Sequence, residues 1–162
     1  MTEINELYSE NKTEMYDLLL RQLLALTEGE KHIIPNLANA AALIYNALNE
    51  INWAGFYLMT DGYLLLGPFQ GKTACVKIPV GRGVCGTAVS ENQTQLIADV
   101  HQFRGHIPCD GASNSEIVIP IRAKNEIIGV LDIDSPLIGR FDEEDKKGLE
   151  SLAKILESAC EW

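Results

Sequence analysis

Three of the four cysteines, Cys75, Cys85 and Cys109, lie in segments rich in glycine or proline near the middle of the chain. Cys109 belongs to the polar run 101–110, which also carries two histidines and an aspartate. A cysteine that only fills a core usually lies inside an apolar helix or strand, whereas a cysteine in a polar loop beside histidines and carboxylates is placed to react. The placement therefore predicts thiol chemistry.

Two other segments have residue types that could bind a ligand. Residues 81–88 place three glycines around Cys85 at the expected start of a short helix. The bare backbone amides of these glycines could contact an anion. An equally good interpretation is that the glycines only allow a tight turn. Asp132 and Asp134 leave the same face of an expected strand. Two like charges beside apolar neighbours indicate a cation site, and the alternative is a turn capped by one aspartate.

Cysteine and histidine together raise the question of zinc. Structural zinc sites favour Cys-x2-4-Cys spacing, and zinc deaminases need His-x-Glu followed by Pro-Cys-x-x-Cys. Neither spacing occurs in the sequence, so we expect no metal site. His32 lies at a helix start and is expected to be solvated. His101 and His106 flank Cys109, where they either hold the loop by hydrogen bonds or contact a substrate.

Length and charge narrow the class of protein. A chain of 162 residues predicts one domain, residues 1–162, with a core that needs no disulfides. Its net charge of -10 would repel nucleic acid and anionic lipid. The sequence shows no signal-peptide pattern, in which a basic segment leads into an apolar one, and no apolar stretch long enough to span a membrane. We therefore expect a cytoplasmic protein without a membrane partner. In that reducing compartment cysteines are more often catalytic, redox-active or metal-binding than structural.

Hydrophobic spacing predicts the elements that must position these residues. Helices are expected over 12–28 and 33–48, and Asp142 is expected to cap a C-terminal helix whose apolar stripe includes Cys160. Asp61-Gly62 suits a hairpin between strands 52–58 and 63–66. The further expected strands are 74–78, 94–98, 116–121 and 127–133. The prediction is an α+β fold, with a central, mostly antiparallel sheet of about six strands and the N- and C-terminal helices packed on it.

Six motifs together carry a resemblance to a known family. They are WAGFYL (53–58), LGPFQGK (66–72), GRGVCGTA (81–88), HQFRGHIPCD (101–110), SEIV (115–118) and GVLDIDS (129–135). In this order they resemble the free methionine-(R)-sulfoxide reductases, which are single GAF-fold domains. The likeness runs from about Glu14 to the C-terminal helix. Arg104 and Pro108 depart from the family pattern beside the key cysteine, so they bear on the conformation of that loop.

The resemblance implies a role for each matching residue. It implies that Cys109 is the nucleophile, Cys75 the resolving thiol and Cys85 an auxiliary thiol, that Glu116, Asp132 and Asp134 are the binding carboxylates, and that Trp53 and Tyr57 are the ring contacts. It also implies that the substrate is free L-methionine-(R)-sulfoxide, that thioredoxin or an equivalent dithiol resets the enzyme, and that no cofactor is needed. The oligomeric state is left open, a homodimer included.

The chemistry of sulfoxide reduction calls for the same residue types. A thiolate must attack sulfur while the oxygen is protonated, which fits Cys109 with Glu116 or Asp134 as the acid. The face of Trp53 could stabilise the positive charge on sulfur, although Trp53 and Tyr57 could also be ordinary core aromatics. Asp132 and Asp134 would hold the ammonium group of the amino acid. The resulting sulfenic acid would condense with a thiol, and a dithiol would reduce the disulfide.

Two other classes of protein stay open on the sequence alone. A GAF sensor module would bind a small regulator without chemistry. A redox switch would pair Cys75 with Cys109 in response to oxidant, without turnover. Consumption of methionine sulfoxide separates an enzyme from both.

Overall fold

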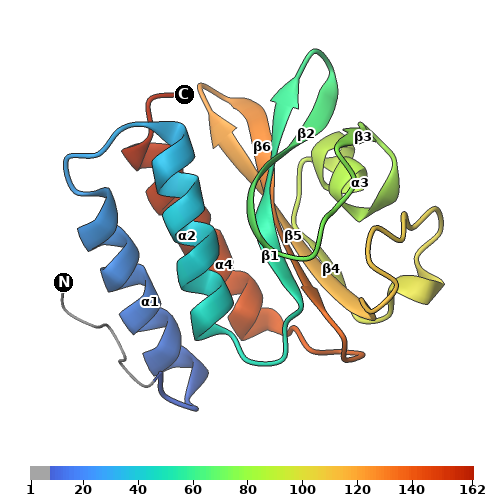
Figure 1. The fold of residues 1–162 in the computed structure, drawn as a ribbon, viewed down its shortest axis with the longest axis horizontal. Coiled ribbons are helices and arrows are strands. Elements are labelled where there is room, and N and C mark those ends of the chain that lie inside the picture. The colour runs from blue at the N-terminus through green and yellow to red at the C-terminus, as the bar shows by residue number, and fades with distance from the viewer. Residues whose placement is uncertain (1–7) are drawn as a thin grey trace.

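The computed structural model describes residues 8–162, which form a six-stranded sheet between two helical layers (Figure 1). The strands are β1 (Trp53–Thr60), β2 (Tyr63–Gly71), β3 (Lys77–Pro79), β4 (Gln95–Ile97), β5 (Ser115–Ala123) and β6 (Glu126–Ser135). The helices are α1 (Lys12–Thr27), α2 (Ile33–Ala47), α3 (Gly83–Glu91) and α4 (Glu143–Ala159), with a 3-10 turn, η1, at Val100–Gln102. The strand order is β3-β2-β1-β6-β5-β4, and every neighbouring pair is antiparallel. The predicted α+β class is confirmed.

Local turn chemistry explains the two hairpins. Asp61 and Gly62 both have positive φ, as the predicted tight turn requires, and they join Thr60 to its partner Tyr63. Lys124 and Asn125 do the same between β5 and β6. These turns set the register beside them, and one register shift in each hairpin, between Gly55 and Tyr57 and between Ile121 and Arg122, sets it further along.

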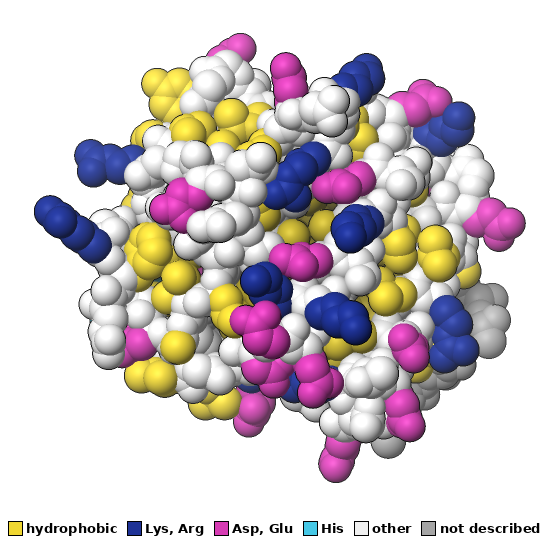
Figure 2. Space-filling view, turned by 180° about the vertical axis from the view of Figure 1, so that it is seen from behind, with side chains coloured by type: hydrophobic (Ala, Val, Ile, Leu, Met, Phe, Trp, Pro, Cys, Tyr) yellow, Lys and Arg dark blue, Asp and Glu magenta, His cyan; other side chains and the backbone are white. Residues whose placement is uncertain are grey.

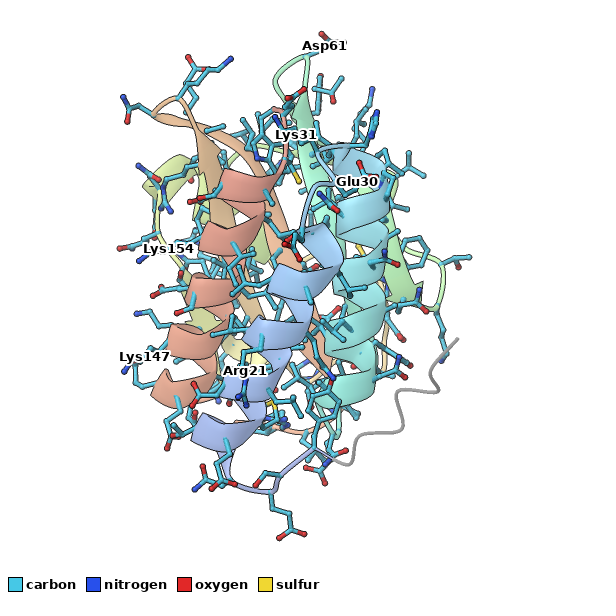
Figure 3. All side chains as sticks on the ribbon, turned by 90° about the vertical axis from the view of Figure 1, so that its left-hand side faces the viewer. Arg21, Glu30, Lys31, Asp61, Lys147 and Lys154 are labelled. Atoms are coloured by element: carbon cyan, nitrogen blue, oxygen red, sulfur yellow. A yellow bond between two sulfur atoms is a disulfide. The ribbon has the colours of Figure 1, made fainter. Side chains whose placement is uncertain are left out.

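One face of the sheet is covered by α2 and α4, and α1 lies outside them (Figure 3). Alternation along β1, β5 and β6 sends apolar residues to this face. The largest fully buried ones are Phe56, Ile117, Ile119, Ile121, Leu131 and Ile133. Asp142 caps α4 as predicted, through a capping box with Asp145. Cys160 is buried at the end of α4, as expected of a packed residue.

The opposite face carries α3 and the segments around residues 72–76 and 99–114 (Figure 1). A second core joins Trp53 and Tyr57 of β1 to Val84 and Cys85 of α3. The predicted strand over 74–78 is wrong in its first half, since β3 begins at Lys77 and Cys75 lies before it. The backbone at Cys75 has other partners: the Tyr57 hydroxyl donates to the Cys75 carbonyl, and the Cys75 side chain is bonded to Cys109.

The surface shown in Figure 2 mixes acidic and basic side chains over exposed apolar patches, and Lys and Arg do not gather there. Within residues 8–162, the helices are all too short or too polar to cross a membrane.

Candidate active site

A disulfide joins Cys75 to Cys109, whose Cα atoms lie 5.6 Å apart although 34 positions separate them in the sequence. Both residues are half-buried, and both lie in irregular segments on the α3 side of the sheet. Cys85 and Cys160 are the free cysteines, and both are buried. The structure thus brings together the two thiols that the resemblance assigns to a redox pair.

Cys109 lines a cavity that is partly open to solvent. The sequence-predicted residues Trp53, Tyr57, Cys85, Glu116, Asp132 and Asp134 all line the same cavity, and Cys75 is held at its edge by the disulfide. Alternation explains how three strands supply this set. Trp53 and Tyr57 of β1, Glu116 of β5, and both aspartates of β6 point to the α3 face, opposite the helix-covered core.

The aromatic residues fix the segment that carries Cys75. Trp53 Nε1 donates to the Lys72 carbonyl at 3.1 Å, and the Tyr57 hydroxyl donates to the Cys75 carbonyl at 3.0 Å. The two rings stack with their centroids 5.9 Å apart. Trp53 and Tyr57 therefore form a wall of the cavity and also position the backbone beside the disulfide, so the two sequence-based interpretations of these rings are compatible.

The loop after Cys109 is tied to the sheet through Asn52. The Asn52 side-chain amide donates to Asp110 Oδ2 and to Ser113 Oγ, each at 3.1 Å. Ser113 lines the same cavity as Asp134 and favours the ionised form of that carboxyl group. Sequence reasoning missed Asn52 and Ser113, because only the folded loop brings them beside the aspartates.

The carboxylates crowd together in a setting with little water. Register pairs Glu116 with Asp134 and Val118 with Asp132, so the three acids lie on adjacent strands. Burial, followed by the charges of Asp132 and Asp134, raises the pKa of Glu116 well above its usual range. Burial also raises the pKa of Asp132 to about 6, and burial together with Asp132 raises the pKa of Asp134. The cluster therefore retains protons near neutral pH.

Cys85 lies deep in this acidic cavity. Its sulfur is 4.0 Å from Glu116 Oε1, and burial together with Asp132 and Glu116 raises the thiol pKa well above its usual value. A thiol in such surroundings stays protonated and is a poor nucleophile.

The sequence left two roles open for His101 and His106, which were to hold the loop or to contact a substrate, and the two residues lie in different surroundings. His101 Nε2 lies 2.8 Å from Asn114 Oδ1, so His101 holds the loop. His106 lines the cavity, with Nε2 3.8 Å from Glu116 Oε2, and burial lowers its pKa. The exposed His32 contacts Glu30 far from the cavity, as expected of a solvated residue.

The glycines around Cys85 serve backbone geometry. Gly81 and Gly83 have positive φ, and a Cβ at Gly86 would lie 2.5 Å from the Pro79 carbonyl oxygen. At Gly83 a Cβ would also press on Ile107, the residue through which the Cys109 loop packs on α3. The tight-turn interpretation of this segment is therefore supported.

Comparisons with known proteins agree with the fold and the cavity. A family model described as a GAF domain matches residues 35–161. The chain is 63% identical over 147 residues to the free methionine-R-sulfoxide reductase of Escherichia coli. The aligned region covers 91% of this chain and 89% of that relative.

Solved structures give the same result. The fRMsr of Staphylococcus aureus in its reduced form has a TM-score of 0.87 and 57% identity, covering 89% of this chain and 94% of that one. The free methionine-R-sulfoxide reductase of Neisseria meningitidis, solved in complex with its substrate, has a TM-score of 0.92 and 41% identity. That alignment covers 95% of this chain and 93% of the Neisseria chain.

Fold and cavity together define a GAF domain with a disulfide-bonded pair of cysteines beside buried carboxylates. Within that class, the chain belongs to the free methionine-R-sulfoxide reductase family.

Proposed function

We propose that this protein reduces free L-methionine-(R)-sulfoxide to methionine, with Cys109 as the nucleophile and Cys75 as the resolving thiol. The observation that carries the proposal is the Cys75–Cys109 disulfide beside a cavity walled by Trp53 and Tyr57. The relatives named as free methionine-R-sulfoxide reductases support the choice of substrate and epimer. We also propose that residues 1–162 act as one domain.

The first step transfers oxygen from the substrate to Cys109. The Cys109 thiolate attacks the sulfoxide sulfur while Glu116 donates a proton to the oxygen. Attack joins the Cys109 sulfur to the substrate sulfur; the protonated oxygen then passes to Cys109 as this S–S bond and the S–O bond of the substrate break, so methionine leaves and Cys109 holds the oxygen as a sulfenic acid. Glu116 suits this role because it lines the cavity and its raised pKa keeps a proton available. Asp134, whose pKa is also raised, is the alternative donor.

The second step resets the enzyme. The Cys75 thiol attacks the sulfenic acid, the disulfide forms, and water leaves with the oxygen. A dithiol such as thioredoxin then reduces the disulfide by exchange and is itself oxidised. Both cysteines are half-buried and Val76 beside them is 68% exposed, which supports access by such a partner. This reductant belongs to the reducing cytoplasm, where we place the protein.

The substrate would be held by its two ends. Asp132 and Asp134 would bind the ammonium group, and Trp53 and Tyr57 would contact the methyl group and sulfur. Cys85, a buried thiol with a raised pKa, would be auxiliary and not the attacking group. All of these residues belong to one chain, so a homodimer would leave the chemistry unchanged.

Turnover of each methionine sulfoxide epimer, free and within a peptide, tests the proposal in a thioredoxin-coupled assay. Cys109→Ser should abolish turnover, whereas Cys75→Ser should release about one methionine per chain and then stop. Cys160→Ser, which removes the buried thiol of α4, is the control and should leave turnover unchanged. Equal activity in Cys109→Ser would refute the assignment. Disulfide formation with peroxide but no consumption of sulfoxide would favour the redox switch, and binding without consumption would favour the sensor.

A further inference from the structure

The floor of the cavity places one thiol and two carboxylates from three different elements around a common point. Cys85 of α3, Glu116 of β5 and Asp132 of β6 each offer a donor atom, and these atoms all lie within 4.8 Å of one another. The three residues are only 3%, 6% and 6% exposed. Spacing rules for zinc could not find this set, because its members are 31 and 16 positions apart along the chain.

A second observation shows that the cluster can accept a ligand. Asp132 Oδ1 is buried and has no hydrogen-bond partner among the described residues, although Asp132 lines the cavity. Buried acceptors are normally paired, so an unpaired carboxylate oxygen in a cavity indicates a site for a donor or a cation.

We propose that a thiophilic divalent cation binds Cys85, Glu116 and Asp132 and thereby excludes methionine sulfoxide from the cavity. The preferred cation is Zn²⁺. Zinc takes sulfur at about 2.3 Å and carboxylate oxygen at about 2.0–2.2 Å, so donor atoms around a tetrahedral ion lie about 3.5 Å apart. The Cys85 sulfur and Glu116 Oε1 are 4.0 Å apart, which requires only a small contraction. His106 does not belong to this group of donor atoms, although its Nε2 lies 3.8 Å from Glu116 Oε2, so the fourth position would be left to water or would require His106 to move inward.

The choice of metal follows from the donor set. Mg²⁺ and Ca²⁺ prefer an all-oxygen shell, whereas a thiolate favours Zn²⁺ and Co²⁺. Binding replaces the Cys85 proton and the protons that Glu116 and Asp132 retain, all of which are released to solvent, and no atom changes its oxidation state. The cation would also relieve the repulsion between the two carboxylates. Since Asp132 is the proposed partner of the substrate's ammonium group, cation and substrate would compete. The inhibition rests on the proposed function, and the binding does not.

The test uses the oxidised protein, in which the Cys75–Cys109 disulfide leaves Cys85 and Cys160 as the free thiols. Titration calorimetry should show one Zn²⁺ per chain, and Co²⁺ should produce a sulfur-to-cobalt charge-transfer band. Cys85→Ser should abolish the band. Cys85→Ser and Asp132→Asn should each weaken Zn²⁺ binding by about 100-fold. Loss of a residue that only supports a metal ligand already weakens binding by about 10–100-fold, and loss of a ligand itself should weaken it at least as much. Cys160→Ser should change neither signal. Unchanged binding in Cys85→Ser and Asp132→Asn, or Mg²⁺ binding as tightly as Zn²⁺, would overturn the site.

Competition is measured separately. Methionine sulfoxide added to the oxidised protein should displace Co²⁺ and bleach the band, since no turnover occurs without a reductant. In the coupled assay, Zn²⁺ should raise the apparent KM without changing kcat, and a chelator should reverse the effect. Cobalt that stays bound at saturating sulfoxide would overturn the exclusion. A protein that binds Zn²⁺ at Cys85 but reduces no sulfoxide would refute the proposed function and leave the metal site standing.

Discussion

At the scale of single residues, Glu116 shows most directly how burial produces function. Its carboxyl group is 6% exposed, and the neighbouring Asp132 and Asp134 oppose its ionisation. A protonated carboxylic acid is thereby kept beside the disulfide-forming Cys109 in the same cavity. We predict that Glu116→Gln lowers kcat/KM by about 10²–10⁴-fold, the usual contribution of a general acid. The measurement is the coupled assay with a chelator present, and the exposed Glu126→Gln is its control. Unchanged turnover would transfer the acid role to Asp134.

The same raised pKa has a consequence for stability. A carboxyl group with a raised pKa in the folded state contributes stability below its unfolded pKa of about 4.3, and that contribution is lost as pH rises through the folded value. Glutamine cannot ionise, so the thermal midpoint of Glu116→Gln should exceed that of the wild type increasingly from pH 5 to pH 9. Thermal denaturation across this range measures the difference. A constant difference would mean that the pKa of Glu116 is not raised in the folded protein.

At the scale of elements, the sequence predicted what local chemistry determines. Asp61-Gly62 and the Asp142 cap specify a turn and a helix start with few residues, and alternation correctly placed Asp132 and Asp134 on one face. The position of Glu116 opposite Asp134 depends on the register shift between Ile121 and Arg122, which the turn that joins β5 to β6 does not encode.

Asp145 shows a second limit of sequence reasoning. Asp145 is one of three acidic residues in the first turn of α4, where a sequence pattern predicts exposed side chains, but it is fully buried. It bonds to Lys12 at 2.6 Å and to the Tyr16 hydroxyl at 2.8 Å, and Arg140 is 3.4 Å away. These partners come from α1 and from the segment before α4, so only the packed helices reveal its role.

Asn52 connects an element to the chemistry. Its amide anchors the loop that follows Cys109, through Asp110 and Ser113. Asn52→Ala should destabilise the fold by about 1–3 kcal/mol, because buried hydrogen-bonding groups lose their partner. It should also slow formation of the Cys75–Cys109 disulfide after a single turnover. Urea denaturation and quenched-flow alkylation measure the two effects. Asn46→Ala, on the exposed side of α2, is the matched control, and identical disulfide rates would show that the loop needs no anchor.

Gly148 controls how closely two helices approach. A Cβ at this position in α4 would lie 2.4 Å from the ring of Tyr16 in α1, well inside contact distance. Gly148→Ala should therefore cost about 1–3 kcal/mol, as overpacking usually does, despite the higher helix propensity of alanine. Gly111→Ala, whose Cβ would meet nothing within 4 Å, should leave the urea midpoint nearly unchanged. A more stable Gly148→Ala would show that α1 can move away at little cost.

At the scale of the whole molecule, the sheet separates stability from chemistry. Its helix-covered face holds the larger apolar core, and its other face holds α3, the cavity and the irregular segments around 72–76 and 99–114 (Figure 1). Substitutions that unfold the protein are expected mainly on the first face, and substitutions that change only activity on the second.

The disulfide is the covalent link on the second face, and it closes a loop of 34 residues. In the chain-entropy model such a loop restricts the unfolded chain by about 4 kcal/mol, and measured gains are typically about 2–4 kcal/mol. The oxidised protein should therefore be more stable than the reduced protein by about 2–4 kcal/mol. Urea denaturation with and without dithiothreitol measures this difference, and a Cys75→Ser/Cys109→Ser double variant should show none. In the proposed mechanism turnover closes and opens this disulfide, so the free energy of unfolding should rise when substrate oxidises the reduced enzyme. Equal midpoints for the two redox forms would mean that these segments are already held together without the bond.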